Sequence, residues 1–343
     1  KVKSEIIGSI DEAFLEKLRA GDVFILGGNK YVFRFASGMT AQVVPTTDRS
    51  PTVPSWFSEM LPLSFDLSLE IQKFRKYMEE KFKQKKSKTE ILKFINKYLY
   101  LNKNAANSMY EYFKEQYSFA EIPHEKKLLI EFYKEYDKNY VIFHSLYGRR
   151  VNDVLSRAIA YAISRLQHRD VEIGINDHGF YISSRDKKKI QVLRAFSLLK
   201  SKELSQIMAM AIDKTEVLKR RFRHCATRSL MILRQYKGVR KRVGRQQVSS
   251  MILLSAVKRI SENFPILKEA RREVLEDLMD IENATKILKQ IEQGKIKIKQ
   301  ISTTLPSPFS LNLVSQGFTD AFKMEDKIEF LRKMHKQLLN KIK

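Results

Sequence analysis

Alternation of apolar and polar residues near the start of the chain predicts a small antiparallel sheet. Residues 22–44 hold two runs of β-branched and aromatic residues separated by Gly27-Gly28-Asn29, and a third run follows Ser37-Gly38. Short runs divided by turn residues are typical of hairpin strands. We expect a short helix at about 11–18 before them and a small barrel or curled sheet that completes the meander.

A proline-rich loop follows and leads into helices. Four prolines lie between residues 44 and 62, with serines and threonines among them, which predicts a rigid, exposed loop that presents Trp56. Apolar residues at helical spacing begin at Leu67, and further helices are predicted to about Tyr117.

The middle of the chain predicts an antiparallel α+β lobe. Residues 127–147 read as two strands, a helix is expected at about 150–167, and two more strands flank Asp177-His178-Gly179. The ββαββ order favours the α+β class. Beyond residue 187 the pattern is helical almost to the end, apart from a short extended run at 295–303.

The predicted fold is therefore α+β: a small antiparallel β-barrel or sheet with helical flanks, plus a mostly helical C-terminal part. We divide the chain into residues 1–125, with the meander, the tryptophan loop and helices, and residues 126–343, with the α+β lobe and basic helices. Both parts are expected to form one composite accessory domain. In the helical part, breaks are expected near Lys200, Asp213, Gly238, Pro265 and Gly294.

Charge narrows the choice of partner. The chain has 64 Lys and Arg against 39 Asp and Glu, a formal net charge of +25. A field of this size attracts polyanions, either nucleic acid or an acidic membrane surface. No acidic residue lies from Val217 through Ser261, although thirteen Lys and Arg do. An acid-free run of this kind differs from the mixed-sign surface of an ordinary solvated helix, and it favours nucleic acid.

Several other classes lack support. No apolar run approaches the ~20 residues of a membrane-spanning helix, and the N-terminus has no signal-peptide layout, so no membrane partner is expected. The single cysteine, Cys225, excludes a disulfide framework and agrees with a reducing, cytoplasmic location.

Motifs for catalysis are missing as well. Gly294-Lys295 has no upstream glycine partner, so there is no Walker loop, and the chain alone is not expected to bind or hydrolyse ATP. The six histidines form no H-E-x-x-H or close pair, and there is no C-x-x-C, so no metal site is assigned. No serine lies in a G-x-S-x-G elbow, and no catalytic residue is assigned.

The strongest positive signal is the basic stretch at 217–247. On a helix, one apolar stripe would face the core, formed by Leu218, Phe222, Cys225, Ala226, Leu230 and Leu233. Arginines on the other faces suit bidentate phosphate contacts, and glutamine amides suit phosphates, sugars or base edges. The alternative is a solvated cationic face. The residues that we predict to contact nucleic acid here are Arg220, Arg221, Arg223, His224, Arg228, Arg240, Lys241, Arg242, Arg245, Gln246 and Gln247.

Three further residues are candidates. Trp56 could stack on an unpaired base, or it could plug the barrel or help the two lobes to pack. Arg149 and Arg150 begin a predicted helix, where exposed amides favour phosphate. Their alternative role is a salt bridge to Asp153 or Glu131.

Four long stretches resemble the C-terminal part of the helicase core of the large helicase-related (Lhr) family. They read GSIDEAFLEKLRAGDVFILGGNKYVFRF, VPSWFSEMLPLSFDLSLEIQKFR, FHSLYGRRVNDVLSRAIAYAISR, and RFRHCATRSLMILRQYKG followed by VGRQQ. A shorter stretch, PSPFS at 306–310, also matches. Together they are ordered and spaced as in the family and span almost the whole chain.

The resemblance implies a superfamily 2 DNA helicase whose two motor lobes and winged helix would precede Lys1. The whole enzyme would move 3′ to 5′ on single-stranded DNA with ATP and Mg²⁺ in those motor lobes, and it would also unwind RNA–DNA hybrids. This chain would be an accessory domain with a β-barrel that closes around the tracking strand. Trp56 matches a tryptophan that stacks on a base of that strand. The lysine content is archaeal in style.

Two hypotheses of other classes remain open. One is a base-processing domain like those of some DNA glycosylases, which would need a pocket for a flipped base. The other is a protein-docking platform, for which the Lys-rich helices would serve only solubility.

Overall fold

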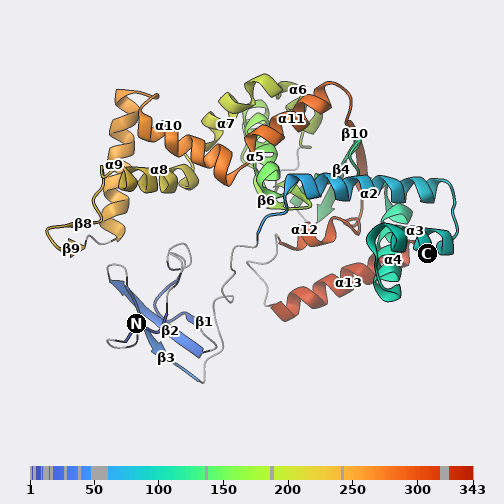
Figure 1. Cartoon of the computed structure of the whole chain (residues 1–343), viewed down its shortest axis with the longest axis horizontal. Coiled ribbons are helices and arrows are strands. Elements are labelled where there is room, and N and C mark those ends of the chain that lie inside the picture. The colour runs from blue at the N-terminus through green and yellow to red at the C-terminus, as the bar shows by residue number, and fades with distance from the viewer. Residues whose placement is uncertain are drawn as a thin grey trace. The chain divides into compact units, whose positions relative to one another are not determined.

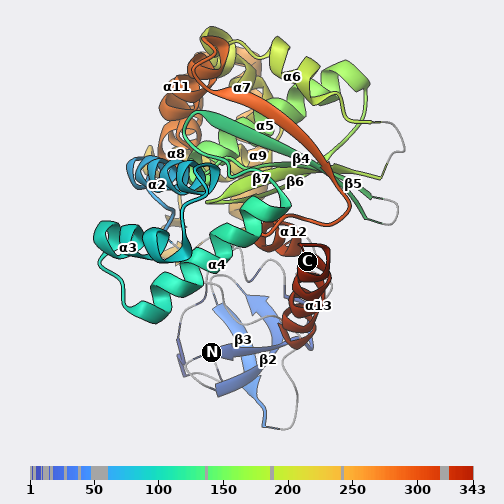
Figure 2. The same ribbon diagram turned by 90° about the vertical axis from the view of Figure 1, so that its right-hand side faces the viewer.

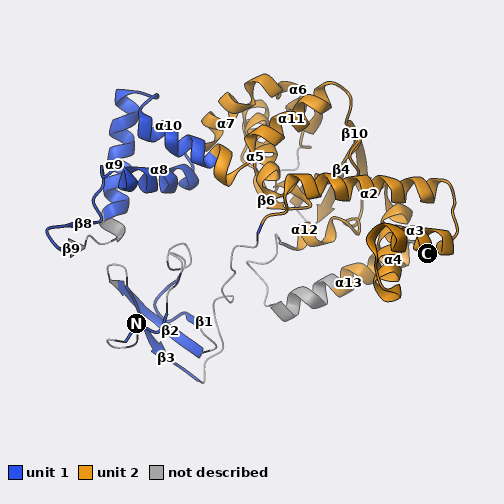
Figure 3. Ribbon diagram, in the orientation of Figure 1, with its two compact units in different colours: residues 1–61, 214–274 blue, residues 62–213, 275–343 orange. Residues whose placement is uncertain are grey.

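The computed structural model describes residues 2, 5–8, 10, 15, 18–26, 29–37, 40–47, 61–135, 138–185, 189–240, 243–316 and 324–342 (Figure 1). Two compact units form: unit 1 contains residues 1–61 and 214–274, and unit 2 contains residues 62–213 and 275–343 (Figure 3). Each unit combines two separate stretches of sequence. The boundary predicted after residue 125 would separate two continuous stretches, and it stays a prediction.

The N-terminal part of unit 1 is a three-stranded antiparallel sheet. Its strands, in the order β1-β2-β3, are β1 (Val23–Leu26), β2 (Asn29–Ser37) and β3 (Thr40–Pro45). A small apolar cluster supports it, formed by Leu18, Phe24, Tyr31, Phe33 and Val43. The two predicted hairpins are confirmed. Of the two predicted forms, a barrel or a sheet, the described strands form the sheet. The barrel that the family resemblance implied is not found among them, because three short strands are too few to close. The expected helix at 11–18 falls largely outside the described residues.

The second part of unit 1 is helical. Its elements are α8 (Glu216–Arg228), the hairpin strands β8 (Gln235–Tyr236) and β9 (Val239–Arg240), α9 (Val243–Ile260) and α10 (Pro265–Arg272). The breaks predicted at Gly238 and Pro265 are confirmed. Pro265 begins α10, where the missing amide hydrogen of proline costs no helical hydrogen bond.

Unit 2 begins with three helices, α2 (Phe65–Lys83), α3 (Lys88–Leu99) and α4 (Lys103–Phe119). Each starts at a side chain that accepts a hydrogen bond from a backbone amide of the first turn, namely Ser64, Ser87 and Asn102. The apolar faces of the three helices meet in one aromatic-rich core that contains Phe74, Met78, Ile91, Ile95, Tyr110 and Phe113. Phe309, from the end of the chain, completes this core.

A five-stranded sheet is the centre of unit 2. Its order is β10-β4-β5-β7-β6, with β4 (Lys127–Glu135), β5 (Lys138–Phe143), β6 (Glu172–Asn176), β7 (Gly179–Ser184) and β10 (Lys297–Thr303). With α5 (Arg149–Gln167) between β5 and β6, the predicted ββαββ order and the α+β class are confirmed. The sheet is mixed, however, because β10 pairs in parallel with β4. The four strands of the ββαββ lobe pair antiparallel as predicted, and the parallel strand β10 is added from the later extended run at 295–303.

The two faces of this sheet carry different partners (Figure 2). On one face, Tyr140, Ile142 and Tyr181 pack with Leu313 and Val314 of α12 (Leu311–Gln316). Alternate residues of the strands point to the opposite face. There, the ring of Phe143 stacks on that of Phe180, with centroids 4.3 Å apart.

The remaining elements of unit 2 are α6 (Val192–Leu198), a 3₁₀ turn (Ser201–Glu203), α7 (Leu204–Ile212), a π-helical segment (Glu273–Leu278) that begins in unit 1, α11 (Ile281–Glu292) and α13 (Met324–Ile342). Interruptions near Lys200, Asp213 and Gly294 are as predicted. Among the described helices, none has the length and apolar character needed to cross a membrane.

A buried carboxylate on β4 connects that strand to the end of β10 and to the segment after it. Glu131 of β4 is fully buried, and its Oε2 lies 2.8 Å from Nε2 of His144. Its oxygens also accept hydrogen bonds from the amide and hydroxyl of Ser307 and from the hydroxyl of Thr303. Burial raises the pKa of Glu131, but the hydrogen bonds from His144 and Ser307 outweigh burial and leave the pKa below its ordinary value. The PSPFS stretch thus has a structural role.

A second acidic side chain, Glu79 of α2, is buried among cations. It contacts Lys127, accepts a hydrogen bond from Lys83 at 2.9 Å, and lies 3.2 Å from Nε2 of His124. Burial acts to raise its pKa, but the hydrogen bonds from His124, Lys127 and Lys83 lower the pKa to about 2.

The depressed pKa of Glu79 predicts a loss of stability in acid. A carboxylate with a lowered folded-state pKa stabilises the fold above its ordinary pKa, and this contribution is lost as the pH falls from about 4.5 toward 2. The Glu79→Gln variant should therefore lose on the order of 3 kcal/mol of unfolding free energy at pH 7. Its stability should also vary less than that of the wild type between these two pH values. Urea unfolding at several pH values measures both effects.

The exposed neighbour Glu80 provides the matched control. The Glu80→Gln variant should stay within about 0.5 kcal/mol of the wild type at pH 7. Equal losses in the two variants would contradict this role for Glu79.

Candidate nucleic-acid interface

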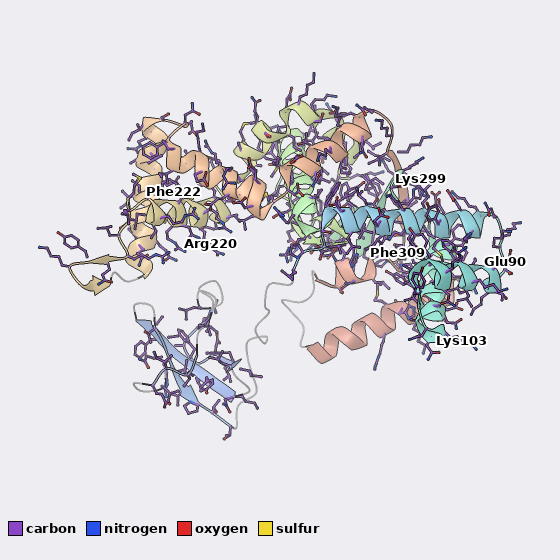
Figure 4. The ribbon with its side chains drawn as sticks, viewed as in Figure 1. Glu90, Lys103, Arg220, Phe222, Lys299 and Phe309 are labelled. Atoms are coloured by element: carbon purple, nitrogen blue, oxygen red, sulfur yellow. The ribbon has the colours of Figure 1, made fainter. Side chains whose placement is uncertain are left out.

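The start of helix α8 and its buried stripe decide which sides of the helix its arginines occupy. The hydroxyl of Thr215 accepts a hydrogen bond from the amide of Leu218 and caps the N-terminus. Leu218, Phe222, Cys225 and Ala226 are buried, as predicted. Arg220 and Phe222 leave α8 on different sides (Figure 4). One face of α8 is therefore core, and Arg220 lies outside it.

The stripe ends earlier than predicted. The helix stops at Arg228, and Leu230 has a left-handed backbone with φ of 60°. Leu230 is 72% exposed and Leu233 is 37% exposed, so the prediction that these two residues belong to the core is wrong. Instead, Ile232 is buried, and its amide donates to the carbonyl of Ala226. Helical spacing predicts burial only within the helix, so it does not apply beyond the left-handed residue that follows the helix end.

A groove of about 340 Å³ lies between α8 and α9. Its lining consists of Glu216, Lys219, Arg220, Arg223, Gln247, Ser250, Met251 and Leu254. We call the α8 face formed by Glu216, Lys219, Arg220 and Arg223 the groove side of α8. Three of the predicted contacts, Arg220, Arg223 and Gln247, come together here. Arg220 is exposed, whereas Arg223 is 8% exposed and forms part of the wall. The acid of the groove, Glu216, forms an ion pair with Lys219 at 2.6 Å.

Two predicted arginines lie on a different side of α8 and are neutralised there. Glu273, which is 4% exposed, comes from the π-helical segment. It forms an ion pair with Arg228 and lies 3.6 Å from Nη1 of Arg221. Arg221 and Arg228 therefore fix the packing of α8 through Glu273, whereas Lys219, Arg220 and Arg223 line the groove.

The other residues of the predicted set vary in position. His224 is half-buried on α8, and Gln246 is 8% exposed on α9. The backbone places Arg240 at the end of β9 and Arg245 in the first turn of α9. Three predicted residues, Trp56, Lys241 and Arg242, lie outside the described residues, so their roles stay predictions.

In unit 2, the start of α5 is occupied by protein groups. The carboxylate of Asp177 accepts hydrogen bonds from the amides of Arg149 and Leu63. The Arg150 guanidinium donates to the carbonyls of Glu276 and Met279, at the end of the π-helical segment. The helix-terminal amide expected to face phosphate is thus used within the fold, and so is one end of Arg150. Neither expected salt bridge is seen, since Asp153 pairs with Arg157 and Glu131 contacts His144.

Sequence reasoning missed one surface residue near this interface. Tyr236, in the β8–β9 hairpin, is 57% exposed. The available signal was Lys237-Gly238, two residues between short extended runs, which is typical of a tight hairpin turn.

The residues that build this site lie within stretches that match known families. Residues 122–310 match the family described as "DEAD/H associated", and residues 1–53 match the "Large helicase-related protein, winged helix domain". Over its full length the chain is 52% identical to the "ATP-dependent helicase Lhr-Core" of Methanothermobacter thermautotrophicus, of which it covers 40%. The chain belongs to the large helicase-related (Lhr) family.

A second Lhr relative, the "ATP-dependent helicase Lhr-Core" of Sulfolobus acidocaldarius, is 43% identical over 97% of this chain. This chain covers 38% of that relative. Among solved structures, the "Structure of Mycobacterium smegmatis helicase Lhr bound to ssDNA and AMP-PNP" matches with a TM-score of 0.64 and 22% identity. The match covers 78% of this chain and 33% of that one, and it shows that the two share a fold.

These comparisons correct one expectation. We expected the winged helix of the Lhr helicase to precede Lys1, but the winged-helix family matches residues 1–53. The open sheet β1-β2-β3 lies inside this match. It therefore belongs to the winged-helix domain, which also explains why the expected barrel is absent.

Proposed function

We propose that this chain is a nucleic-acid-binding accessory region of an ATP-dependent 3′ to 5′ DNA helicase, and that it grips the tracking single strand along the groove side of α8. The observation that carries the proposal is the arrangement of Lys219, Arg220 and Arg223 along one groove with Gln247 of α9. The strand would contact this region through its phosphates.

Charge and geometry support a phosphate contact. Lys219 and Arg220 begin the run from Val217 through Ser261 that contains no acidic residue. The planar fork of an arginine matches two phosphate oxygens, and the amide of Gln247 can add a neutral hydrogen bond. Because every nucleotide carries the same phosphate, contacts of this kind hold a strand without selecting its sequence.

The motor lobes of the whole helicase would supply movement, and they would bind ATP and Mg²⁺. This chain spans about 40% of the length of the curated relatives it matches. The solved Mycobacterium smegmatis relative is described as bound to ssDNA, which supports single-stranded DNA as the partner here. The motor lobes of the same polypeptide would be its protein partners, because the winged-helix match lies within this chain. RNA–DNA hybrids would be a second nucleic-acid substrate.

Salt dependence tests this function. Fluorescence anisotropy would follow the binding of a labelled single-stranded oligonucleotide of mixed sequence to the wild-type chain. With about three phosphate contacts, the logarithm of the affinity should fall with the logarithm of salt at a slope of roughly −2. This slope corresponds to roughly 20-fold weaker binding between about 50 and 200 mM salt. An affinity that does not change with salt would contradict the proposal.

A further inference from the structure

The β8–β9 hairpin is a tight turn attached to the end of α8. Gln235 pairs with Arg240 and Tyr236 with Val239, which leaves Lys237 and Gly238 as the two turn residues. Both have positive φ, 47° and 78°, the backbone that the tightest two-residue hairpin turns require. Figure 3 shows the hairpin extending outward from the helices of its own unit. Tyr236 is therefore held at a defined place beside the turn.

Apolar groups gather around this hairpin without forming a core. Tyr236 is 57% exposed, and three residues of the segment that leads to it, Leu230, Met231 and Leu233, are between 37% and 72% exposed. Single exposed apolar side chains are common, but four within seven residues form a patch. The buried Ile232 anchors the patch to α8.

The surroundings of the patch are cationic. The ammonium of Lys237 lies 5.6 Å from the centre of the Tyr236 ring. A hollow of about 470 Å³ at the base of the hairpin is lined by Thr227, Arg228, Leu230, Ile232, Leu233, Arg234 and Gln235. The acid-free run from Val217 through Ser261 contains the whole hairpin. A partner that fits must offer flat apolar faces together with negative charge.

Unpaired nucleotides have this combination, since each joins the π-face of a base to a phosphate. In a duplex the base faces are covered by stacking, whereas a single strand or a strand end exposes them. We propose that Tyr236 is a stacking post for an unpaired base, with the neighbouring Lys237 and Arg234 facing the phosphates. The inference rests on the proposed function and deepens it, because it names where bases are contacted.

The test uses single-stranded oligonucleotides that carry the fluorescent base 2-aminopurine, whose emission is quenched by stacking on an aromatic ring. Wild-type chain should quench the emission on binding. The Tyr236→Ala variant should lose most of the quenching and bind roughly tenfold more weakly at high salt, where phosphate contacts are screened. The Tyr236→Phe variant keeps the ring and should behave as the wild type.

A second exposed tyrosine serves as the control. Tyr100, at the end of α3 in unit 2, is 93% exposed, and the Tyr100→Ala variant should quench as the wild type does. Unchanged quenching in Tyr236→Ala, or binding without quenching in the wild type, would overturn the stacking post and leave the phosphate grip intact. Absence of any single-strand binding by the wild type at low salt would overturn both proposals.

Discussion

Reversing Lys219 and Arg220 together should weaken single-strand binding about 100-fold while the fold stays intact. The two charge-assisted contacts are each worth about 1.5 kcal/mol, and each 1.4 kcal/mol changes a dissociation constant about tenfold. Both side chains line the groove between α8 and α9. Because Arg220 is exposed and Lys219 forms its ion pair with Glu216 on the same helix, the Lys219→Glu/Arg220→Glu variant leaves the core stripe of α8 unchanged. Anisotropy measures the affinity, and circular dichroism checks the fold.

A matched variant separates a local contact from the general charge of the protein. Lys93 and Lys97 are exposed on α3 in unit 2, and Lys93→Glu/Lys97→Glu makes the same change in net charge. Its affinity should fall only a few-fold, through the weaker long-range field. If the two variants bind equally, the groove side has no special role. Reversal of Arg221 and Arg228 would be less informative, because it would place new carboxylates beside the buried Glu273 and disturb the fold itself.

Replacing Glu131 with alanine should lower the free energy of unfolding by about 3 to 5 kcal/mol. The carboxylate is fully buried and receives the hydrogen bonds of Ser307 and Thr303, beside His144. Its loss leaves several buried donors without an acceptor and opens a cavity in β4. The expected loss is a large share of the stability of an ordinary domain. Urea unfolding at neutral pH measures it.

Smaller changes around Glu131 should give graded losses. The Thr303→Val variant removes one hydroxyl donor, keeps the shape, and should cost about 1 kcal/mol. A loss of less than 1 kcal/mol in Glu131→Ala would mean that the cluster contributes little to the fold. Because β10 ends at Thr303 and PSPFS begins three residues later at Pro306, hydrogen exchange should show the largest loss of protection in this segment.

Local sequence patterns predicted the hairpins and most of the buried stripe of α8, because neighbouring residues determine these features. Period-two alternation and turn residues located the hairpins of both sheets, and helical spacing located the buried stripe through Ala226. The same spacing failed at Leu230, which has a left-handed backbone just after α8 ends. Glycine is the residue that usually marks such a position, and here a leucine occupies it. The parallel addition of β10 to β4 joins residues about 170 positions apart, so no local pattern could reveal it.

The site was predicted only in part, for a related reason. Charge pattern correctly placed a basic helix, but not which arginines the fold would neutralise. Arg228 meets Glu273 across 45 residues of sequence, and Glu273 lies beyond the acid-free run from Val217 through Ser261. Arg150 likewise meets carbonyls more than 120 residues away. Which cations are neutralised is thus decided by tertiary contacts. Tyr236 was overlooked for another reason, because Gly238 was interpreted only as a helix break.

The most direct test of the phosphate grip is the salt slope of a single neutral substitution. The Arg220→Gln variant keeps a polar side chain and removes one charge from the groove side. For single strands, each lost phosphate contact should reduce the steepness of the logarithmic salt dependence by about 0.7. Anisotropy titrations of wild type and variant across several salt concentrations give the two slopes. A slope for Arg220→Gln that is shallower by about this amount is the expected result, and identical slopes would contradict a phosphate contact at Arg220.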